Sequence, residues 1–487
     1  MTDRPQPIGP TRRKAAALAC AVAAFVVLLL LPPPEGLEPP GWRTAAVVVL
    51  MAILWMTEAL PLPATALLPL ALFPTLGIAT LDDTAAPYAN PLIFLFLGGF
   101  LIALAIERWG LHRRIALTLL SRIGAREDFQ IGGVMVATAA ISMWVSNTAT
   151  TLMMLPVALS IVPRSEKGGV DAAHGGFASA LLLGVAYGAS LGGVATLVGT
   201  PPNALFAGFM LENYDVEIGF GRWMLMAVPV SFVMLGVTWA LLTRGLYRLR
   251  RDALPGAREA IGAALEELGP ASSGEKRTAL IFGVTALLWL ARPFLMRPFP
   301  GLALSDTSIA IAGAMALFFV PSRRRRGERL LDWSHAERLP WGVLLLFGGG
   351  LSLASAIADS GLAHWIGGQL TALDQWPTIW LIVAIVLLIT LFSELASNTA
   401  TAATFLPVVA ALAETVGAQP LRLAVPAALT ASFAFMLPVA TPPNAIVFGS
   451  GHISVAQMLR AGIWLDVIGV VVVVGITWTF ATAVFGP

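Results

Sequence analysis

The sequence predicts an all-α polytopic membrane protein with about 11 transmembrane helices and two re-entrant hairpins, arranged as two inverted repeats. Three observations support this fold class. Apolar residues make up 57% of the 487 residues, charged residues make up only 12%, and two polar motifs of the first half recur in the second. A soluble domain carries roughly twice that share of charge. The bilayer, rather than water, is therefore the expected solvent for most of the surface.

The first predicted element is an apolar run at 15–31, which follows a polar and basic tail at 1–14. A signal peptide has similar flanks, but no small-residue cleavage site follows this run, only Pro32-Pro33-Pro34. We therefore expect a retained span after a cytoplasmic tail. Cys20, the single cysteine, lies in this run, so an internal disulfide and a cysteine-based metal cluster are excluded. The net charge of +2 points to no nucleic-acid partner.

Further spans are expected where apolar runs approach the length of about 20 residues that crosses a bilayer. They lie at 44–60, 61–76, 91–107, 177–211, 222–243, 278–296, 307–321, 341–358, 423–448 and 461–485. Two more apolar stretches, 129–162 and 377–415, are each interrupted at the centre by a polar tripeptide. We expect these two stretches to be re-entrant hairpins.

The distribution of Lys and Arg predicts the orientation, because basic residues concentrate in cytoplasmic loops. With a cytoplasmic N-terminus and two hairpins, all but five of the 30 basic residues fall inside. The Arg323–Arg326 run is then a topology anchor, and 251–277 is an amphipathic cytoplasmic linker. We expect a multi-pass protein of a bacterial inner membrane with an external C-terminus. The five basic residues that fall outside in this orientation are Arg43, Arg222, Arg292, Arg297 and Arg422.

An internal repeat relates the two halves of the chain. Between 142–156 and 393–407, eight of fifteen positions are identical, including the tips Ser146-Asn147-Thr148 and Ser397-Asn398-Thr399. Thr200-Pro201-Pro202-Asn203 likewise matches Thr441-Pro442-Pro443-Asn444. The charge distribution makes the repeats inverted, one at 15–250 with scaffold helices 15–107, the other at 278–487 with scaffold helices 278–358. Inverted repeats with broken helices are typical of alternating-access transporters, whose site lies at the midplane.

The four breaks predict paired ion sites. Prolines end the preceding helix and leave carbonyl oxygens free, which suits a small cation. The helices that begin after each hairpin tip present unpaired amides and a positive dipole end, which suits an anion. The expected cation ligands are Ser142, Ser146, Asn147 and Gly199 in the first half, and Ser393, Ala396, Asn398 and Ala440 in the second. The expected anion contacts are Ser146, Asn147, Thr148, Thr200, Pro201, Ser397, Asn398, Thr399, Thr441 and Pro442.

Two acids lie near these motifs. Glu394 precedes the second tip, where it either tunes the charge of the second cation site or faces a water-filled vestibule. Glu58 lies in a Trp-Met-Thr-Glu-Ala-Leu-Pro stretch and is expected to be structural.

Through the paired Ser-Asn-Thr motifs, the chain resembles the divalent anion/sodium symporter family over nearly its whole length. The family includes di- and tricarboxylate carriers and sulfate carriers. The resemblance implies Na⁺ at both tips and a substrate carboxylate between them. It also implies a homodimer whose transport domain moves as an elevator against the scaffold. The implied function is sodium-coupled uptake of a C4-dicarboxylate such as succinate, malate or fumarate.

Several alternatives stay open at this point. Within the family they are citrate uptake, sulfate uptake and sodium-independent exchange. An intramembrane enzyme would need a paired acid, a Ser/His pair or a His-Glu-x-x-His spacing, and the five histidines offer none. A channel usually has a filter loop on a symmetry axis rather than two inverted tips in one chain. We therefore expect a transporter rather than an enzyme.

Overall fold

The computed structural model describes residues 12–163, 175–250, 254, 256–296, 298, 301, 304–323, 327–369 and 375–485. Within these residues the chain is helical and has no strand, only one isolated bridge between Pro321 and Arg329. The predicted all-α class is therefore confirmed. Predictions for residues 1–11, 251–253 and 324–326 fall outside the described part of the chain.

Nine helical segments of the described residues are long and apolar enough to cross a membrane. Their average composition is strongly apolar, as a bilayer requires of every spanning helix. They contain α1 (Arg12–Leu30), α2 (Pro39–Thr57), α6 (Pro91–Arg108), α10 (Gly175–Val194), α12 (Phe220–Ala240), α14 (Ser273–Met296), α17 (Trp341–Asp359), α19 (Thr378–Leu395) and α23 (Val455–Phe485).

Two of the predicted spans are shorter than expected. The 61–76 stretch forms two short helices, α3 (Leu62–Thr65) and α4 (Leu68–Thr75), because prolines are spaced through it. The 307–321 stretch is α15 (Asp306–Phe319), a helix of 14 residues. The remaining short elements are α5 (Leu81–Ala85), the 3₁₀ helix η1 (Ala86–Ala89), the π-helical turn η3 (Leu241–Leu246) and α16 (Trp333–Ala336).

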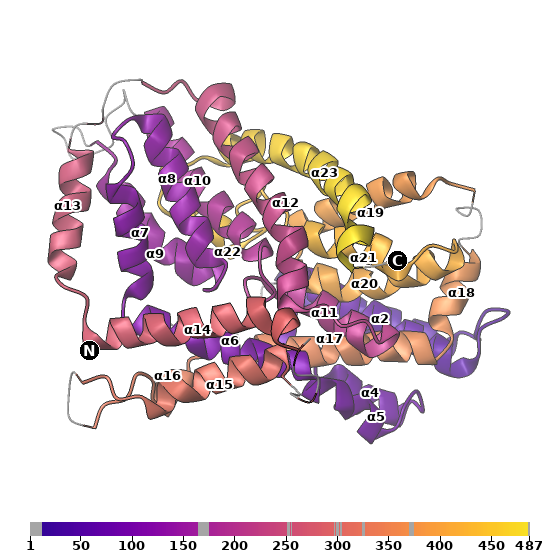
Figure 1. The fold of residues 1–487 in the computed structure, drawn as a ribbon. Coiled ribbons are helices and arrows are strands. Elements are labelled where there is room, and N and C mark those ends of the chain that lie inside the picture. The colour runs from indigo at the N-terminus through magenta and orange to yellow at the C-terminus, as the bar shows by residue number, and fades with distance from the viewer. Residues whose placement is uncertain are drawn as a thin grey trace, which may run out of the picture.

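The same order of elements occurs in both halves of the chain (Figure 1). In each half a long helix leads into a short helix, a hairpin, a broken helix and a final long helix. The first series is α6, α7 (Leu111–Ser121), α8 (Glu127–Ser142), α9 (Asn147–Ser160), α10, α11 (Pro201–Tyr214) and α12. The second is α17, α18 (Leu362–Gln369), α19, α20 (Asn398–Thr415), α21 (Pro420–Thr430), α22 (Pro442–Gly449) and α23.

Each broken helix is shared between the two halves. The part before the break packs on the hairpin of its own half: α10 packs on α8 and α9, and α21 on α19 and α20. The part after the break crosses over, so that α11 packs on α20 and α21, and α22 packs on α9 and α10. This crossed packing brings the two tips and the two breaks into one region of the molecule.

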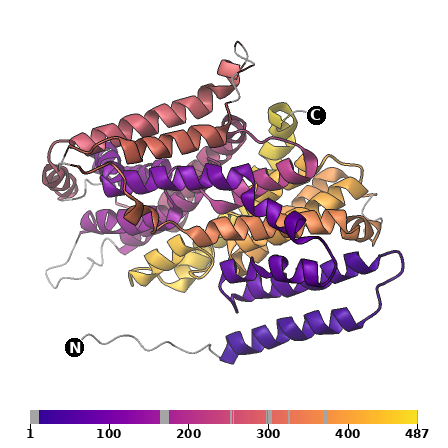
Figure 2. The same cartoon turned by 90° about the horizontal axis from the view of Figure 1, so that it is seen from below.

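Two segments lie at the edges of this arrangement. The helices α1 and α2 run side by side at one border of the molecule, as Figure 2 shows, and Ala21 is the one buried residue of α1. The predicted amphipathic linker contains α13 (Ala257–Leu268). That helix packs on α7, to which Arg113 and Glu267 join it by an ion pair of 3.2 Å.

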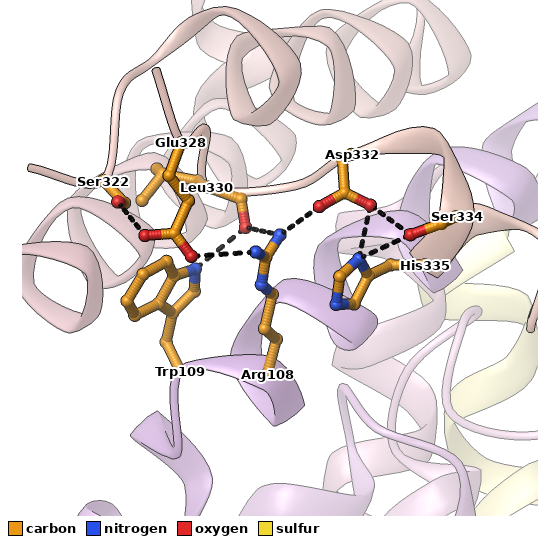
Figure 3. Close-up of polar contacts among 8 residues, drawn as sticks. All are labelled: Arg108, Trp109, Ser322, Glu328, Leu330, Asp332, Ser334 and His335. Carbon is orange, nitrogen blue, oxygen red and sulfur yellow. Dashed lines mark hydrogen bonds and ion pairs between the residues drawn. The ribbon is translucent and has the colours of Figure 1, made fainter. Parts of the chain in front are cut away.

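A polar cluster ties the end of α6 to the loop between α15 and α16 (Figure 3). The Arg108 guanidinium donates to Glu328 at 3.2 Å, to Asp332 at 3.1 Å and to the Leu330 carbonyl at 3.2 Å. The Trp109 indole donates to the same carbonyl at 2.8 Å. The hydrogen bond from Ser334 to Asp332, followed by contacts with His335 and Arg108, lowers the pKa of Asp332 to about 2.

We expect Arg108→Gln to lower the free energy of unfolding by about 1–3 kcal/mol, because it removes charge-assisted hydrogen bonds to a mostly buried guanidinium. Thermal melting in detergent checks this. The depressed pKa of Asp332 means that its ionised carboxylate stabilises the fold above the ordinary pKa of 3.8. This contribution is lost as the pH falls toward about 2. The difference in melting temperature should therefore stay constant between about pH 5 and 8.

Arg113→Gln is the matched control for this prediction. Among the residues that the structure describes, Arg113 has an ion pair only with Glu267, and the two side chains are 40% and 73% exposed. Such surface pairs contribute about 0–1 kcal/mol. Equal losses in the two variants would contradict a special role for the Arg108 cluster.

Candidate dianion and cation site

The first hairpin reverses between α8 and α9 over residues 143–146. Ser142, the last residue of α8, is fully buried and donates its hydroxyl to Oδ1 of Asn147 at 2.7 Å. The Ser146 hydroxyl accepts from the Ala149 amide at 3.3 Å and so caps α9. The tip therefore gathers three side-chain oxygens around the start of one helix.

The first break, residues 195–200, lies directly against this tip. The Thr196 hydroxyl donates to the Met143 carbonyl at 2.5 Å, which joins the break to the reversal. The buried Asn203 amide donates to the carbonyls of Gly193, Val194 and Thr196 at 3.2, 3.0 and 2.7 Å. The carboxamide thus donates to carbonyl oxygens at and just after the end of α10, where the regular helical hydrogen bonds stop.

Glycine is required at this break by close packing. A Cβ on Gly199 would lie 2.3 Å from the Gly193 carbonyl oxygen, and a Cβ on Gly193 would lie 2.4 Å from Oδ1 of Asn147. The equivalent residues in the second break are Ala440 and Ala434. Only the first break is therefore packed too tightly for a methyl group at these positions.

The second hairpin reverses at Ala396 and Ser397, between α19 and α20. Here the hydroxyl of Ser393 donates to the Ala431 carbonyl at 3.1 Å rather than to the tip. Oδ1 of Asn398 is buried and has no hydrogen-bond partner in the described residues. The Ser397 side chain makes no capping hydrogen bond to the first turn of α20, so the first amides of this helix are also available.

The second break, residues 431–441, has the same carboxamide contact as the first. Asn444 donates to the carbonyls of Ala434 and Leu437 at 3.1 and 3.0 Å, and the Thr441 hydroxyl accepts from the Asn444 amide at 3.4 Å. Glu394 adds a contact that the first break lacks, because its carboxylate accepts the amides of Phe435, Met436 and Leu437. Of the two roles weighed for Glu394, facing a vestibule does not fit a side chain that is 2% exposed.

A single cavity of about 1100 Å³ contains both tips and both breaks. All ten residues expected to contact the anion line it. Of the expected cation ligands, six line it, while Ser142 and Ser393 are fully buried behind its wall. Its charged lining residues are Arg13, Lys14 and Glu58, at the start of α1 and the end of α2.

Comparison with known proteins identifies the family. The family model described as "Sodium:sulfate symporter transmembrane region" matches residues 12–486 of this chain. The chain belongs to this family. The resemblance first seen in the paired Ser-Asn-Thr tips is thereby confirmed, and the chain is a transporter rather than an enzyme.

Sequence relatives are similar over most of the chain. The sodium-dependent dicarboxylate transporter SdcS of Staphylococcus aureus strain USA300 is 40% identical over 447 residues, which are 91% of this chain and 86% of that protein. The SdcS protein of strain MRSA252 gives the same values. An alignment of this length includes both hairpins and both breaks.

Two solved structures share the fold. The YdaH transporter of Alcanivorax borkumensis is 16% identical with a TM-score of 0.60, and the likeness covers 92% of this chain and 100% of that one. MtrF of Neisseria gonorrhoeae, described as an antimetabolite efflux pump, is 13% identical with a TM-score of 0.58, covering 95% and 97%. At these identities the likeness concerns the fold alone. It agrees with a multi-pass membrane protein.

Some contacts of this site could not be assigned from the sequence. The role of Asn203 and Asn444 as donors to the broken helices was missed, although both end the recurring Thr-Pro-Pro-Asn motif. Their recurrence was the available signal. An asparagine that follows two prolines in both halves indicates that both carboxamides donate to backbone carbonyls of the breaks. Thr196 carried no such signal, because it does not belong to a recurring motif.

Proposed function

We propose that this chain takes up a small dianion together with Na⁺, and that the dianion is a C4-dicarboxylate such as succinate, malate or fumarate. One observation carries the proposal: a single cavity gathers two polar tips and two helix breaks that are neutral in side-chain charge. The name of the SdcS relatives, sodium-dependent dicarboxylate transporter, supports the choice of ions.

Both ions find suitable partners in this cavity. Na⁺ is a hard cation that prefers oxygen, and the tips offer Oδ1 of Asn398 together with backbone carbonyls of the breaks. The dianion faces the N-terminal ends of α9, α11, α20 and α22, whose dipoles favour negative charge, and the first amides of α9 and α20 can donate to it. Because the ligands are neutral, each ion strengthens the site of the other, which couples their binding.

The experiment is uptake of labelled succinate into proteoliposomes, with and without an inward sodium gradient. We expect uptake only with sodium, and competition by malate and fumarate but not by sulfate. Sodium-independent uptake that requires internal dicarboxylate would indicate exchange and overturn the coupling. Preferential competition by citrate or sulfate would overturn the substrate.

We further propose that the two halves are inverted repeats of a homodimeric elevator transporter with a cytoplasmic N-terminus. The recurring order of elements supports the repeat. The cavity reaches Arg13 and Lys14, at the cytoplasmic end of α1 in this orientation, so the structure corresponds to an inward-facing state. The helices at 15–107 and 278–358 are the stationary scaffold, and the hairpins and broken helices move against it.

An aromatic cluster lies at the boundary between these two parts. Trp144, at the first hairpin tip, stacks on Trp289 of α14 with ring centroids 6.3 Å apart, and it also stacks on Phe220. The Phe282 ring meets Trp144 edge-on at 4.9 Å. If the hairpin slides past α14, Trp144 must leave this stack in every transport cycle.

Cross-linking the stack should therefore stop transport. In a Cys20→Ser background we expect a short bismaleimide to link Trp144→Cys with Trp289→Cys and to reduce uptake to background. The same double variant without reagent should transport. A linked protein with undiminished uptake would contradict movement at this boundary, and each single cysteine variant treated with reagent is the control.

A further inference from the structure

An ion-pair cluster on the predicted external side joins the moving part of the chain to the scaffold. Nη1 of Arg292, near the end of α14, lies 2.7 Å from a carboxylate oxygen of Glu217 and 3.3 Å from one of Asp306. Nε of Arg292 also donates to the Leu304 carbonyl at 2.9 Å. Glu217 lies in the loop between α11 and α12, whereas Arg292 and Asp306 belong to α14 and α15. The cluster therefore crosses the boundary at which the proposed elevator slides.

Asp306 makes a second contact across this boundary. Its Oδ2 accepts the amide of Phe220, the first residue of α12, at 2.7 Å. The start of a helix carries a partial positive charge, so a buried carboxylate binds well there. The Phe220 ring stacks on Trp289 with centroids 4.3 Å apart, and the Trp289 indole donates to the Asp306 carbonyl at 2.9 Å. Asp306 thus holds the backbone of α12 and, through Arg292, the loop before it.

A third contact involves the start of α6. Nδ2 of Asn90 donates to Glu212 of α11 at 2.8 Å, while Oδ1 of Asn90 caps α6. On the moving part, all three contacts come from residues 212–220, the end of α11 and the start of α12. The side chains of Asp306 and Arg292 are only 8% and 16% exposed. Because buried charges are costly without partners, both groups would be destabilised if residues 212–220 moved away.

The opposite end of the moving part differs. The helix α23 is the counterpart of α12 in the second half, and its start falls on the predicted cytoplasmic side. There Gln457 donates to the Ser179 hydroxyl at 3.0 Å, which joins α23 to α10, another helix of the moving part. Within the described residues, no hydrogen bond or ion pair joins the first turns of α23 to the scaffold. Of these two matching helix starts, only that of α12 is tied to the scaffold.

We propose that Glu217, Arg292 and Asp306 form an external lock that holds the carrier in its inward-facing state. Outward movement must separate Glu217 from Arg292 and withdraw the Phe220 amide from Asp306, and this cost keeps the outward-facing state in the minority. The inference rests on the proposed function, because it takes the elevator movement as given. It also accounts for Arg292, one of the five basic residues on the predicted external side.

The test uses a probe for the minor outward-facing state. Val198, in the first break, is 5% exposed and packs on Gly99 of α6, where an added Cβ would lie 2.9 Å from Cγ1 of Val198. Its counterpart in the second break, Val439, is 82% exposed. Because inverted repeats exchange their surroundings when such a carrier turns, Val198 should become accessible in the outward-facing state. The parent protein for the test carries Cys20→Ser and Val198→Cys, and a membrane-impermeant maleimide is added to right-side-out vesicles.

Breaking the external lock should raise the labelling rate, because that rate follows the population of the outward-facing state. Asp306→Ala removes both the charge and the acceptor of the Phe220 amide, and we expect a rise of at least about tenfold. Asp306→Asn keeps an acceptor oxygen and should give a smaller rise. Glu217→Gln alters a side chain that is 59% exposed and should give a rise of about two- to fivefold.

Arg222→Gln is the matched control, because it removes one charge from an exposed residue of α12, two positions beyond Phe220. It should be labelled at the parent rate. An equal rise in this variant would show that surface charge alone moves the carrier, and would overturn the lock. Labelling at the parent rate in an Asp306→Ala protein that still melts cooperatively would also overturn it. If Asp306→Ala does not fold, parent-like rates in both Asp306→Asn and Glu217→Gln would do so.

Failure of the proposed function gives a different pattern. In an elevator carrier, sodium and succinate should change the labelling rate of the parent protein, because they bind the two states unequally. If Val198→Cys stays unlabelled in the parent and in every lock variant, with and without these ligands, the elevator movement is wrong and the lock falls with it. If the parent shows ligand-dependent labelling and the lock variants match it, only the lock is wrong.

Discussion

Replacing Asn398 by alanine is expected to abolish sodium-driven uptake while leaving the chain folded. Oδ1 of Asn398 is buried at the second tip and has no hydrogen-bond partner in the described residues, which fits an oxygen that coordinates a cation. Loss of a charge-assisted contact of this kind costs about 1.5–3 kcal/mol in ion affinity, or roughly 10- to 150-fold. Because sodium and dianion strengthen each other, uptake falls with the sodium affinity. Labelled-succinate uptake is the measurement.

The same change at the first tip should have a comparable effect. Oδ1 of Asn147 accepts from Ser142 at 2.7 Å, so Asn147→Ala also leaves the buried Ser142 hydroxyl without its acceptor. Asn213→Ala is the control, because Asn213 lies near the end of α11 and, in the described part of the chain, its side chain bonds only to the Phe209 carbonyl. Normal uptake by either tip variant would refute the assignment of the site.

A methyl group at Gly199 should be nearly as damaging as the loss of a tip asparagine. The added Cβ would lie 2.3 Å from the Gly193 carbonyl oxygen, a distance at which the backbone must shift. Overpacking costs about 1–3 kcal/mol, and here the shift displaces carbonyls expected to face Na⁺. We expect Gly199→Ala to lower uptake by at least about tenfold at limiting sodium.

The second half supplies the mirror control for this prediction. Ala440 already occupies the equivalent position, and Ala440→Gly removes a methyl group from a break with room for it. Uptake should fall far less in this variant. A Gly199→Ala protein with wild-type sodium activation would show that this carbonyl cluster tolerates movement, and the first cation site would then have to lie elsewhere.

The sequence predicted most of the architecture because the bilayer imposes one dominant rule. Long apolar runs had to be helices, and the polar tripeptides at 146–148 and 397–399 had to be reversals or breaks. Prolines placed both broken helices correctly, since α11 and α22 begin at Pro201 and Pro442. Hydropathy did not predict that 61–76 would be split, because apolar composition outweighed the proline spacing.

Tertiary contacts were harder to predict than elements. The motif residues of the two halves line one cavity, as the repeat led us to expect. By contrast, the contact between Glu394 and the 435–437 amides joins residues about forty positions apart, and no periodicity records such a pairing. The need for glycine at 199, where the second break has alanine at 440, likewise depends on how closely two backbone segments approach each other.

The crossed packing of the broken helices constrains how the protein is made. During synthesis α11 emerges long before α20 and α21, the helices that cover it. Until the ribosome has passed residue 430, the apolar flank of α11 and the backbone of the first break must wait in the translocon or among lipids. Premature release at this stage would expose them to proteases, so the membrane-insertion machinery is expected to retain the nascent first half until the second arrives.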